Sequence, residues 1–304
     1  KQLKNYFYQR YKMQHLITTK DFTNDEIIAL YEDAKLFNDL QSNTILKGKL
    51  IVTLFFENST RTRSSFEIAA KRLGADVVNL DVGTSSSSKG ETIFDTVANL
   101  NAMKLDAIVI RHSECGLPQS LVDFVDCPII NAGDGKNSHP TQALLDLYTI
   151  LEHFDGEVKG KKLAIVGDIK SSRVASSNLE LLPRFGIEPV LVAPEHFMPE
   201  NNTFKKAKFL HEVIDELDII MSLRTQLERH TQAYYVSLGE YGKDYCITKE
   251  AVGDKDVLLM HPGPVNRNID ISDEMLVDSR CKVLRQVTNG VAVRMAILDR
   301  KSVV

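Results

Sequence analysis

The chain has 304 residues, of which 43% are hydrophobic and 26% are charged, and its formal net charge is −4. This composition is typical of a globular protein with one large or two ordinary domains, and it excludes a disordered or fibrous chain. The mixed charge argues against a nucleic-acid-binding face, which needs clustered Lys and Arg.

The sequence carries no sign of export or of a membrane span. Its first residues, Lys1-Gln2-Leu3-Lys4, are mixed and polar, which predicts no secretory signal. No apolar run approaches the roughly 18 residues that a spanning helix needs. The chain has four widely spaced cysteines and no Cys-x-x-Cys pair, so we expect a cytoplasmic protein without disulfides or a zinc site. They are Cys115, Cys127, Cys246 and Cys281.

Short apolar runs rich in β-branched residues alternate with segments of helical period along the whole chain. Runs that are apolar throughout are expected for parallel strands covered on both faces. The predicted strands are residues 50–56, 77–82, 106–111 and 128–131 in the first half, and 162–167, 189–193, 217–222 and 257–260 in the second. The sequence thus predicts four strands in each half.

Helices are predicted between these strands. Thr23 and Glu26 form a capping box before an apolar segment. The residues that follow the spacing of one helix face are Phe66, Ala69, Ala70 and Leu73. A helix is also predicted over residues 140–154. A last helix is predicted after Asn289-Gly290, with an apolar stripe at Val291, Met295, Ile297 and Leu298.

The fold class that follows is α/β, with two doubly wound parallel-sheet domains of similar size facing a cleft. We expect residues 1–150, with a C-terminal helix 289–304 packed back on them, to form the first domain. Residues 151–288 form the second, and the polar stretch 155–160 is the expected hinge. Such sheets bind ligands beyond the carboxyl ends of their strands.

The most informative motif is Ser59-Thr60-Arg61-Thr62-Arg63, which lies between a predicted strand and a predicted helix. Ser59 or Thr60 can cap this helix, whose positive dipole end favours an anion. Arg61 adds a planar donor that suits phosphate oxygens. The motif therefore predicts a phosphate site, and the alternative is a capped helix with solvated arginines.

Several other signatures of phosphate or nucleophile chemistry are absent from the sequence. It has no Gly-x-x-x-x-Gly-Lys-Ser/Thr motif, and no Gly-x-Gly-x-x-Gly after the strand that ends at Gly167. It also has no Gly-x-Ser-x-Gly elbow. Nucleotide hydrolysis and dinucleotide redox chemistry therefore lack their usual support.

The Ser59–Arg63 motif resembles the carbamoyl-phosphate signature of the aspartate and ornithine carbamoyltransferase family, and the resemblance covers residues 14 to 300. It continues in order through Lys89-Gly90-Glu91-Thr92, Arg111-His112, Asn131-Ala132-Gly133-Asp134-Gly135, His139-Pro140-Thr141-Gln142, Gly167-Asp168-Ile169-Lys170 with Arg173, Arg224-Thr225-Gln226 and His261-Pro262-Gly263-Pro264. The sequence lacks the Ser-Met-Gly block of the ornithine branch. Arg173 and Arg224 instead suit the two carboxylates of L-aspartate.

The resemblance implies a role for each matching residue. The substrate-binding residues would be Ser59, Thr60, Arg61, Thr62, Ser85, Lys89, Arg111, His139, Gln142, Arg173, Arg224, Gln226, Gly263 and Pro264. Those taking part in catalysis would be Arg61, Thr62, Lys89, Arg111 and His139. Ser85 is the best match within a serine run whose register is open by a residue or two. Val174 departs from members that carry Thr, which puts one hydroxyl contact to aspartate in doubt.

The resemblance also implies an activity and an assembly. The expected reaction transfers the carbamoyl group of carbamoyl phosphate to L-aspartate, a step of pyrimidine biosynthesis, with no cofactor and no metal. Domain closure would bring the amine against the carbonyl carbon. The family's catalytic unit is a homotrimer in which Lys89 enters the neighbouring site, and a regulatory chain or dihydroorotase is a possible partner. The alternatives are a carbamoyltransferase of ornithine or a related amine, and a catalytically silent phosphate-binding paralogue.

Overall fold

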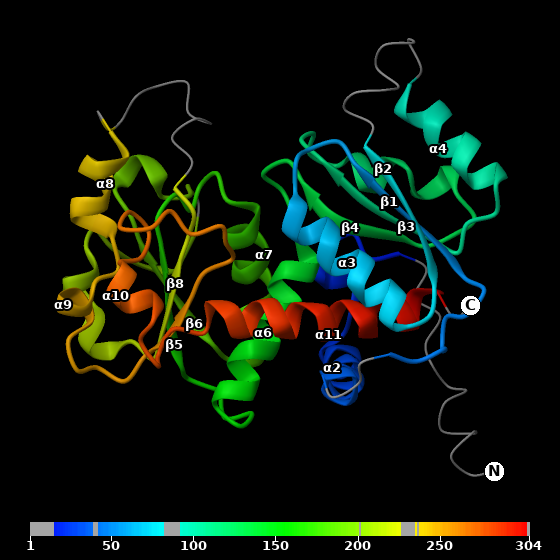
Figure 1. Ribbon diagram of the computed structural model, residues 1–304. Coiled ribbons are helices and arrows are strands. Elements are labelled where there is room, and N and C mark those ends of the chain that lie inside the picture. The colour runs from blue at the N-terminus through cyan, green and yellow to red at the C-terminus, as the bar shows by residue number, and fades with distance from the viewer. Residues whose placement is uncertain are drawn as a thin grey trace. The chain divides into compact units, whose positions relative to one another are not determined.

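The computed structural model describes residues 15–38, 42–81, 92–200, 202–225, 235 and 237–302 (Figure 1). The chain divides into two compact units, Lys1–Leu144 with Asn289–Val304, and Leu145–Thr288. It leaves the first unit within helix α6 (Pro140–His153) and returns to it within helix α11 (Val283–Ser302).

The first unit contains a four-stranded parallel sheet in the order β2-β1-β3-β4. Its strands are β1 (Leu50–Phe55), β2 (Asp76–Asp81), β3 (Ala107–His112) and β4 (Ile129–Asp134). Its further helices are α2 (Asn24–Asn38), α3 (Thr60–Arg72), α4 (Ile93–Ala102) and α5 (Leu117–Ser120), with short 3-10 turns η1 (Thr19–Asp21) and η3 (Val122–Phe124). All six residues of β4 are buried, as a parallel sheet requires.

The helices of the first unit follow the expected sequence signals. The Thr23 hydroxyl accepts from the Glu26 N–H at 3.2 Å, while the Glu26 carboxylate accepts from the Thr23 N–H at 2.7 Å. This confirms the capping box before α2. Helix α3 buries Phe66, Ala69 and Ala70 on one face, and it packs on β1 and β2, so its predicted apolar stripe is confirmed as well.

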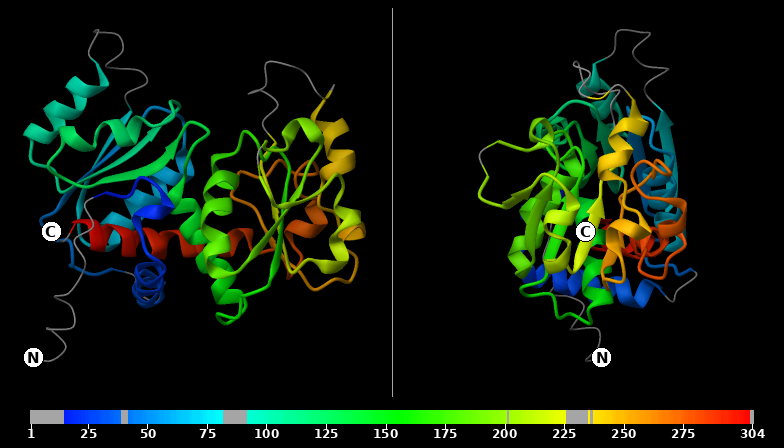
Figure 2. Two further views of the ribbon diagram at one scale, coloured as in Figure 1. Left: turned by 180° about the vertical axis from the view of Figure 1, so that it is seen from behind. Right: turned by 90° about the vertical axis from the view of Figure 1, so that its left-hand side faces the viewer.

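The second unit contains a five-stranded parallel sheet in the order β7-β6-β5-β8-β9. The strands are β5 (Lys162–Val166), β6 (Glu188–Val192), β7 (Lys205–Ala207), β8 (Ile219–Ser222) and β9 (Leu258–Met260). The helices are α7 (Arg173–Leu181), α8 (Leu238–Tyr245), α9 (Lys249–Val252) and α10 (Asp273–Leu276), with 3-10 turns η4 (Leu182–Phe185), η5 (Glu195–Phe197), η6 (Leu210–Glu212) and η7 (Ile214–Glu216). Figures 1 and 2 show α7 and α10 on opposite faces of this sheet. The prediction of two parallel sheets covered by helices is confirmed.

Two predictions about the elements are wrong. The second half has a fifth strand, β7, because a three-residue edge strand that opens with the exposed Lys205 and Lys206 gives no apolar run. Lysine is common on edge strands because it discourages pairing with other chains. The last helix begins at Val283 and not after Gly290. Its first turns alternate exposed Leu284 and Val287 with buried Gln286, which hides the apolar stripe.

Candidate active site

The predicted phosphate-binding motif forms the beginning of α3, directly after β1. Ser59 occupies the N-cap position, but its side chain makes no capping hydrogen bond, so the expected hydroxyl cap is wrong for Ser59. The backbone carbonyl of Ser59 instead accepts from the Arg63 N–H at 3.1 Å. The first turn carries no acidic residue, and Thr60 and Arg61 are exposed. The positive helix end and the Arg61 guanidinium therefore form a surface that favours an anion.

Arg111 lies at the carboxyl end of β3, beside the end of β1. Its Nε donates to the Glu57 carboxylate at 3.1 Å, and its Nη1 donates to the Ala132 carbonyl at 3.4 Å. The exposed fractions of the Arg111 and Glu57 side chains are 13% and 20%. Arg111 pairs with Phe55 in the register of the two strands, so Glu57 follows β1 at the same sheet edge. The sequence motifs assign no role to Glu57. The pairing of β1 with β3 is the signal that could have shown that Glu57 lies beside Arg111.

His139 and Gln142 lie where β4 connects to α6. The His139 carbonyl accepts from the N–H groups of Gln142 and Ala143, at 3.0 and 3.2 Å. His139 Nδ1 lies 3.5 Å from the Thr141 hydroxyl. Both predicted side chains are buried, at 4% exposed for His139 and 8% for Gln142. The histidine is thus held at the start of a buried helix.

A buried carboxylate fixes the turn that leads from β4 to His139. Asp134 accepts from the Ser138 N–H at 2.8 Å, the Gly116 N–H at 2.9 Å and the Asn137 amide at 3.0 Å. Its own N–H donates to the Ser138 carbonyl at 3.0 Å. Because a buried carboxylate needs such donors, Asp134 both requires and defines this turn. Asp134 lies in the motif Asn131–Gly135 that resembles the family, but the sequence assigns it no role.

The predicted phosphate-binding residues of the first unit therefore lie together at the carboxyl ends of neighbouring strands. The Ser59–Thr62 motif follows β1, Arg111 is the next-to-last residue of β3 and His139 follows β4, and these three strands are neighbours in the sheet. His112, next to Arg111, packs edge-on against Phe56 at 4.8 Å. Burial lowers the pKa of His112, against the opposing effect of the Glu114 and Glu57 carboxylates. Ser85 and Lys89 lie outside the described residues.

The second unit carries the predicted aspartate-binding residues at its own sheet edge. Arg173 is the first residue of α7, after β5, and it is 6% exposed. Arg224 is half-buried and follows β8. Gly263 and Pro264 follow β9, and the peptide bond between them is cis. Strands β5, β8 and β9 are neighbours, while Gln226 lies outside the described residues.

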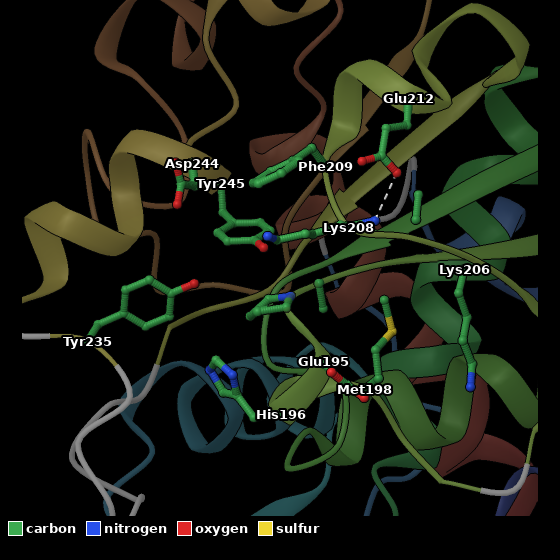
Figure 3. Close-up of a pocket in the computed structure, with 13 residues that line it drawn as sticks. Glu195, His196, Met198, Lys206, Lys208, Phe209, Glu212, Tyr235, Asp244 and Tyr245 are labelled. Carbon is green, nitrogen blue, oxygen red and sulfur yellow. Dashed lines mark hydrogen bonds between the residues drawn. The ribbon is translucent and has the colours of Figure 1, made fainter.

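A pocket of about 640 Å³ in the second unit is lined partly by His196, Phe209, Tyr235 and Tyr245 (Figure 3), and none of the predicted site residues that the structure describes lines it. Across the described ranges, no group of three His, Cys, Asp or Glu side chains could hold a metal ion. No helix in the same ranges is long and apolar enough to cross a membrane.

Comparison with protein-family models gives two matches that follow one another along the chain. Residues 14–152 match the aspartate/ornithine carbamoyltransferase, carbamoyl-P binding domain. Residues 159–300 match the aspartate/ornithine carbamoyltransferase, Asp/Orn binding domain.

The similar proteins and solved structures are named aspartate carbamoyltransferase or aspartate transcarbamoylase. The chain is 69% identical to the aspartate carbamoyltransferase catalytic subunit of Aliarcobacter butzleri and 64% identical to that of Campylobacter lari, over 95% of this chain and 98% of each relative. The catalytic subunit of M. jannaschii aspartate transcarbamoylase superposes with a TM-score of 0.84 at 36% identity, covering 94% of this chain and 97% of that one. The Trypanosoma cruzi enzyme in complex with N-(phosphonacetyl)-L-aspartic acid gives 0.87 at 34% identity, covering 95% and 96%. The chain belongs to the aspartate/ornithine carbamoyltransferase family.

Proposed function

We propose that the protein transfers the carbamoyl group of carbamoyl phosphate to the amino group of L-aspartate, giving N-carbamoyl-L-aspartate and phosphate, as a step of pyrimidine biosynthesis. The observation that carries this proposal is the distribution of arginines. Arg61 and Arg111 lie at the anion-favouring sheet edge of the first unit, and Arg173 and Arg224 at the sheet edge of the second. One phosphate and two carboxylates are the anions that such pairs receive.

In the first unit, Ser59, Thr60, Arg61 and Thr62 bind the phosphate group. Arg111 contacts both the phosphate and the carbonyl oxygen, and it can do so because Glu57 fixes its guanidinium from one side. His139 donates a hydrogen bond to the carbonyl oxygen, and Gln142 holds the carbamoyl amide. In the second unit, the guanidinium groups of Arg173 and Arg224 bind the carboxylates of aspartate. Gln226 assists them, and Gly263 and Pro264 present backbone groups to the carbamoyl amide.

The reaction needs no nucleophile from the protein, because phosphate is already a good leaving group. The aspartate nitrogen attacks the carbonyl carbon, and a tetrahedral oxyanion forms. The bond between carbon and the phosphate oxygen then breaks, and the phosphate leaves with the electron pair and takes the amine proton. Arg61, Thr62, Arg111 and His139 stabilise the oxyanion and the departing phosphate, a contribution of several kcal/mol in comparable sites.

The assembly proposed for the active enzyme is a cytoplasmic homotrimer with shared active sites. Lys89 and Ser85 reach the neighbouring subunit's substrates. The four cysteines are free, which is consistent with a reducing compartment. A regulatory chain or a dihydroorotase is a possible further partner. Mixing Lys89→Ala with Arg61→Ala subunits tests the sharing, because each mixed trimer then contains one site that has both residues. Activity that stays absent in verified mixed trimers contradicts it.

Phosphate release from carbamoyl phosphate, measured with L-aspartate and in parallel with L-ornithine, tests the reaction itself. We expect release with aspartate alone, together with stoichiometric N-carbamoyl-L-aspartate. Release with ornithine alone overturns the roles of Arg173 and Arg224. A verified trimer that binds carbamoyl phosphate and turns over neither acceptor is the silent paralogue.

A further inference from the structure

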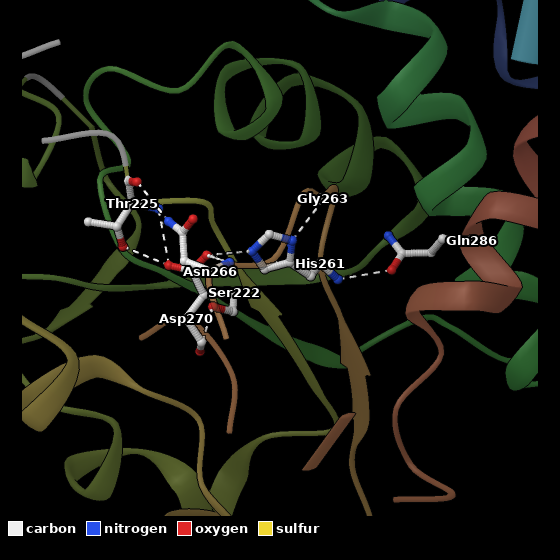
Figure 4. Close-up of polar contacts among 7 residues, drawn as sticks. All are labelled: Ser222, Thr225, His261, Gly263, Asn266, Asp270 and Gln286. Atoms are coloured by element: carbon white, nitrogen blue, oxygen red, sulfur yellow. Dashed lines mark hydrogen bonds and ion pairs between the residues drawn. The ribbon is translucent and has the colours of Figure 1, made fainter. Parts of the chain in front are cut away.

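One carboxylate in the second unit joins two segments of the proposed aspartate-binding site, the segment around Arg224 and the segment around Gly263. Asp270 is 1% exposed. Its Oδ1 accepts from the N–H and the hydroxyl of Thr225, at 3.1 and 2.8 Å. Its Oδ2 accepts from the Asn266 N–H at 2.8 Å and lies 3.2 Å from His261 Nε2 (Figure 4). A single buried side chain thus contacts the chain just after β8 and just after β9.

The hydrogen bonds of His261 fix its tautomer. Its Nδ1 accepts from the Gly263 N–H at 2.7 Å, so this nitrogen carries no proton. The proton of the neutral ring therefore lies on Nε2, which donates it to Asp270. The His261 side chain is fully buried. His261 consequently transmits the position of the Asp270 carboxylate to the Gly263 backbone.

The same network reaches the helix that begins at Arg173. The His261 N–H donates to Gln286 Oε1 at 2.9 Å, and Gln286 Nε2 donates to Asp146 Oδ1 at 2.8 Å. Asp146 Oδ2 accepts from Asn178 at 2.9 Å, and Asn178 lies on α7. Every side chain in this chain of contacts is buried, so each bond lacks a competing water and unmade bonds are costly.

We propose that Asp270, acting through His261, is a positioning residue that holds the Arg224–Thr225 corner and the Gly263–Pro264 turn in one fixed arrangement. This proposal rests on the proposed function, since it concerns the residues that bind aspartate and the carbamoyl amide there. The carboxylate itself contacts no substrate. It is the acceptor that both segments share, so its loss displaces them independently of each other.

Asp270→Asn tests the carboxylate, because one of its oxygens becomes an NH₂ group that faces N–H donors. We expect the KM for aspartate to rise at least about tenfold, since small misplacements of binding groups cost that much or more. The inhibition constant of inorganic phosphate, which reports the first unit, should stay unchanged. Asp273→Asn is the matched control: it removes an exposed carboxylate three residues away that pairs with Arg267, and its kinetics should match the wild type.

His261→Asn tests the link from Asp270 through His261 to the Gly263 backbone. It remains informative if Asp270→Asn fails to fold. The Asn oxygen can accept from Gly263 as Nδ1 does, but the shorter side chain loses Asp270. We expect His261→Asn to lower kcat/KM for aspartate about as much as Asp270→Asn, and the double variant to be no worse than either single one. Three results would overturn the proposal: normal kinetics in a folded His261→Asn or Asp270→Asn protein, losses of kcat/KM that multiply in the double variant, or a parallel loss of phosphate inhibition.

A wild-type protein without turnover would overturn the proposed function instead, and the positioning role, which rests on that function, would be overturned as well.

Discussion

Arg111 and Glu57 form an ion pair across the carboxyl ends of two neighbouring strands, with Nε and the carboxylate oxygen 3.1 Å apart. Both side chains are largely shielded from water, so neither can find an equivalent partner in solvent. The pair orients the Arg111 guanidinium, which also donates to the Ala132 carbonyl. Glu57 thereby reduces the entropy that Arg111 would lose on binding an anion.

Glu57→Gln should therefore lower turnover although Glu57 touches no substrate. The neutral amide keeps the size of the side chain but weakens its hold on Arg111. We expect kcat to fall about tenfold, the loss that corresponds to about 1.4 kcal/mol of transition-state stabilisation. Steady-state phosphate release measures it. Glu67→Gln is the control, because it makes the same change at an exposed pair with Lys71 on α3. Equal effects of the two substitutions would refute the orienting role.

Arg61→Ala should abolish most activity without unfolding the protein. Arg61 is exposed at the first turn of α3, so its removal leaves the core intact. We expect kcat/KM for carbamoyl phosphate to fall at least roughly a hundredfold, as the loss of one oxyanion donor does. Arg72→Ala removes an exposed arginine from the other end of the same helix, and it should behave as the wild type. Near-normal turnover of Arg61→Ala contradicts the phosphate-site assignment.

Gly135→Ala should destabilise the turn that leads to His139. Gly135 has a φ of +49°, and an added Cβ would lie 2.9 Å from the Cys115 nitrogen and the Ser113 carbonyl oxygen. We expect a loss of stability of about 1–3 kcal/mol from the backbone strain, and more from the contact. Gly48→Ala separates the two, since Gly48 has a φ of +81° with no atom within 4 Å of the new Cβ among the described residues. Equal losses in urea unfolding would show that the contact with Cys115 and Ser113 adds nothing.

The sequence was sufficient to predict most of the fold because its strands are buried on both faces. Segments such as β1 and β5 are nearly continuous apolar runs, and this pattern has few other interpretations in a globular chain. β7 was not predicted because an exposed edge strand has no such run. The beginning of α11 was not predicted because its first turns bury Gln286, a polar residue whose partner, Asp146, lies 140 residues away. Tertiary contacts of that kind leave no local signal.

The same distinction separates the site residues that could be predicted from those that could not. Arg61 belongs to a contiguous motif with its own chemical meaning, so its pattern can be recognised in one sequence. Glu57 and Asp270 act through partners that only the sheet register brings close, 54 residues away for Arg111 and 45 for Thr225. Their roles follow from which strands are neighbours. That information lies in the sheet order and not in any local motif.

His112 predicts how the stability of the protein changes with pH. Its ring packs against Phe56, and its Nδ1 accepts from the Glu114 N–H at 2.9 Å, so the folded protein favours the neutral ring. Burial lowers the pKa of His112 in the folded state, while the unfolded chain titrates near an ordinary value of about 6.5. Below that pH the unfolded state binds more protons, and the free energy of unfolding must fall as pH decreases.

The measurement is urea unfolding between pH 7.5 and 5.5, for the wild type and for His112→Asn. The Asn oxygen can accept from the Glu114 N–H, so the comparison at pH 7.5, where neither protein carries a charge at this position, reports the packing change alone. We expect the free energy of unfolding of the wild type to decrease more steeply with acid than that of the variant. Burial lowers the pKa of His153 as well, so part of the slope should remain in His112→Asn and diminish further in a double variant with His153→Asn. If His112→Asn keeps the full wild-type slope, the neutral half-buried ring is not the origin of the acid sensitivity, and the Glu57 and Glu114 carboxylates compensate for its partial burial.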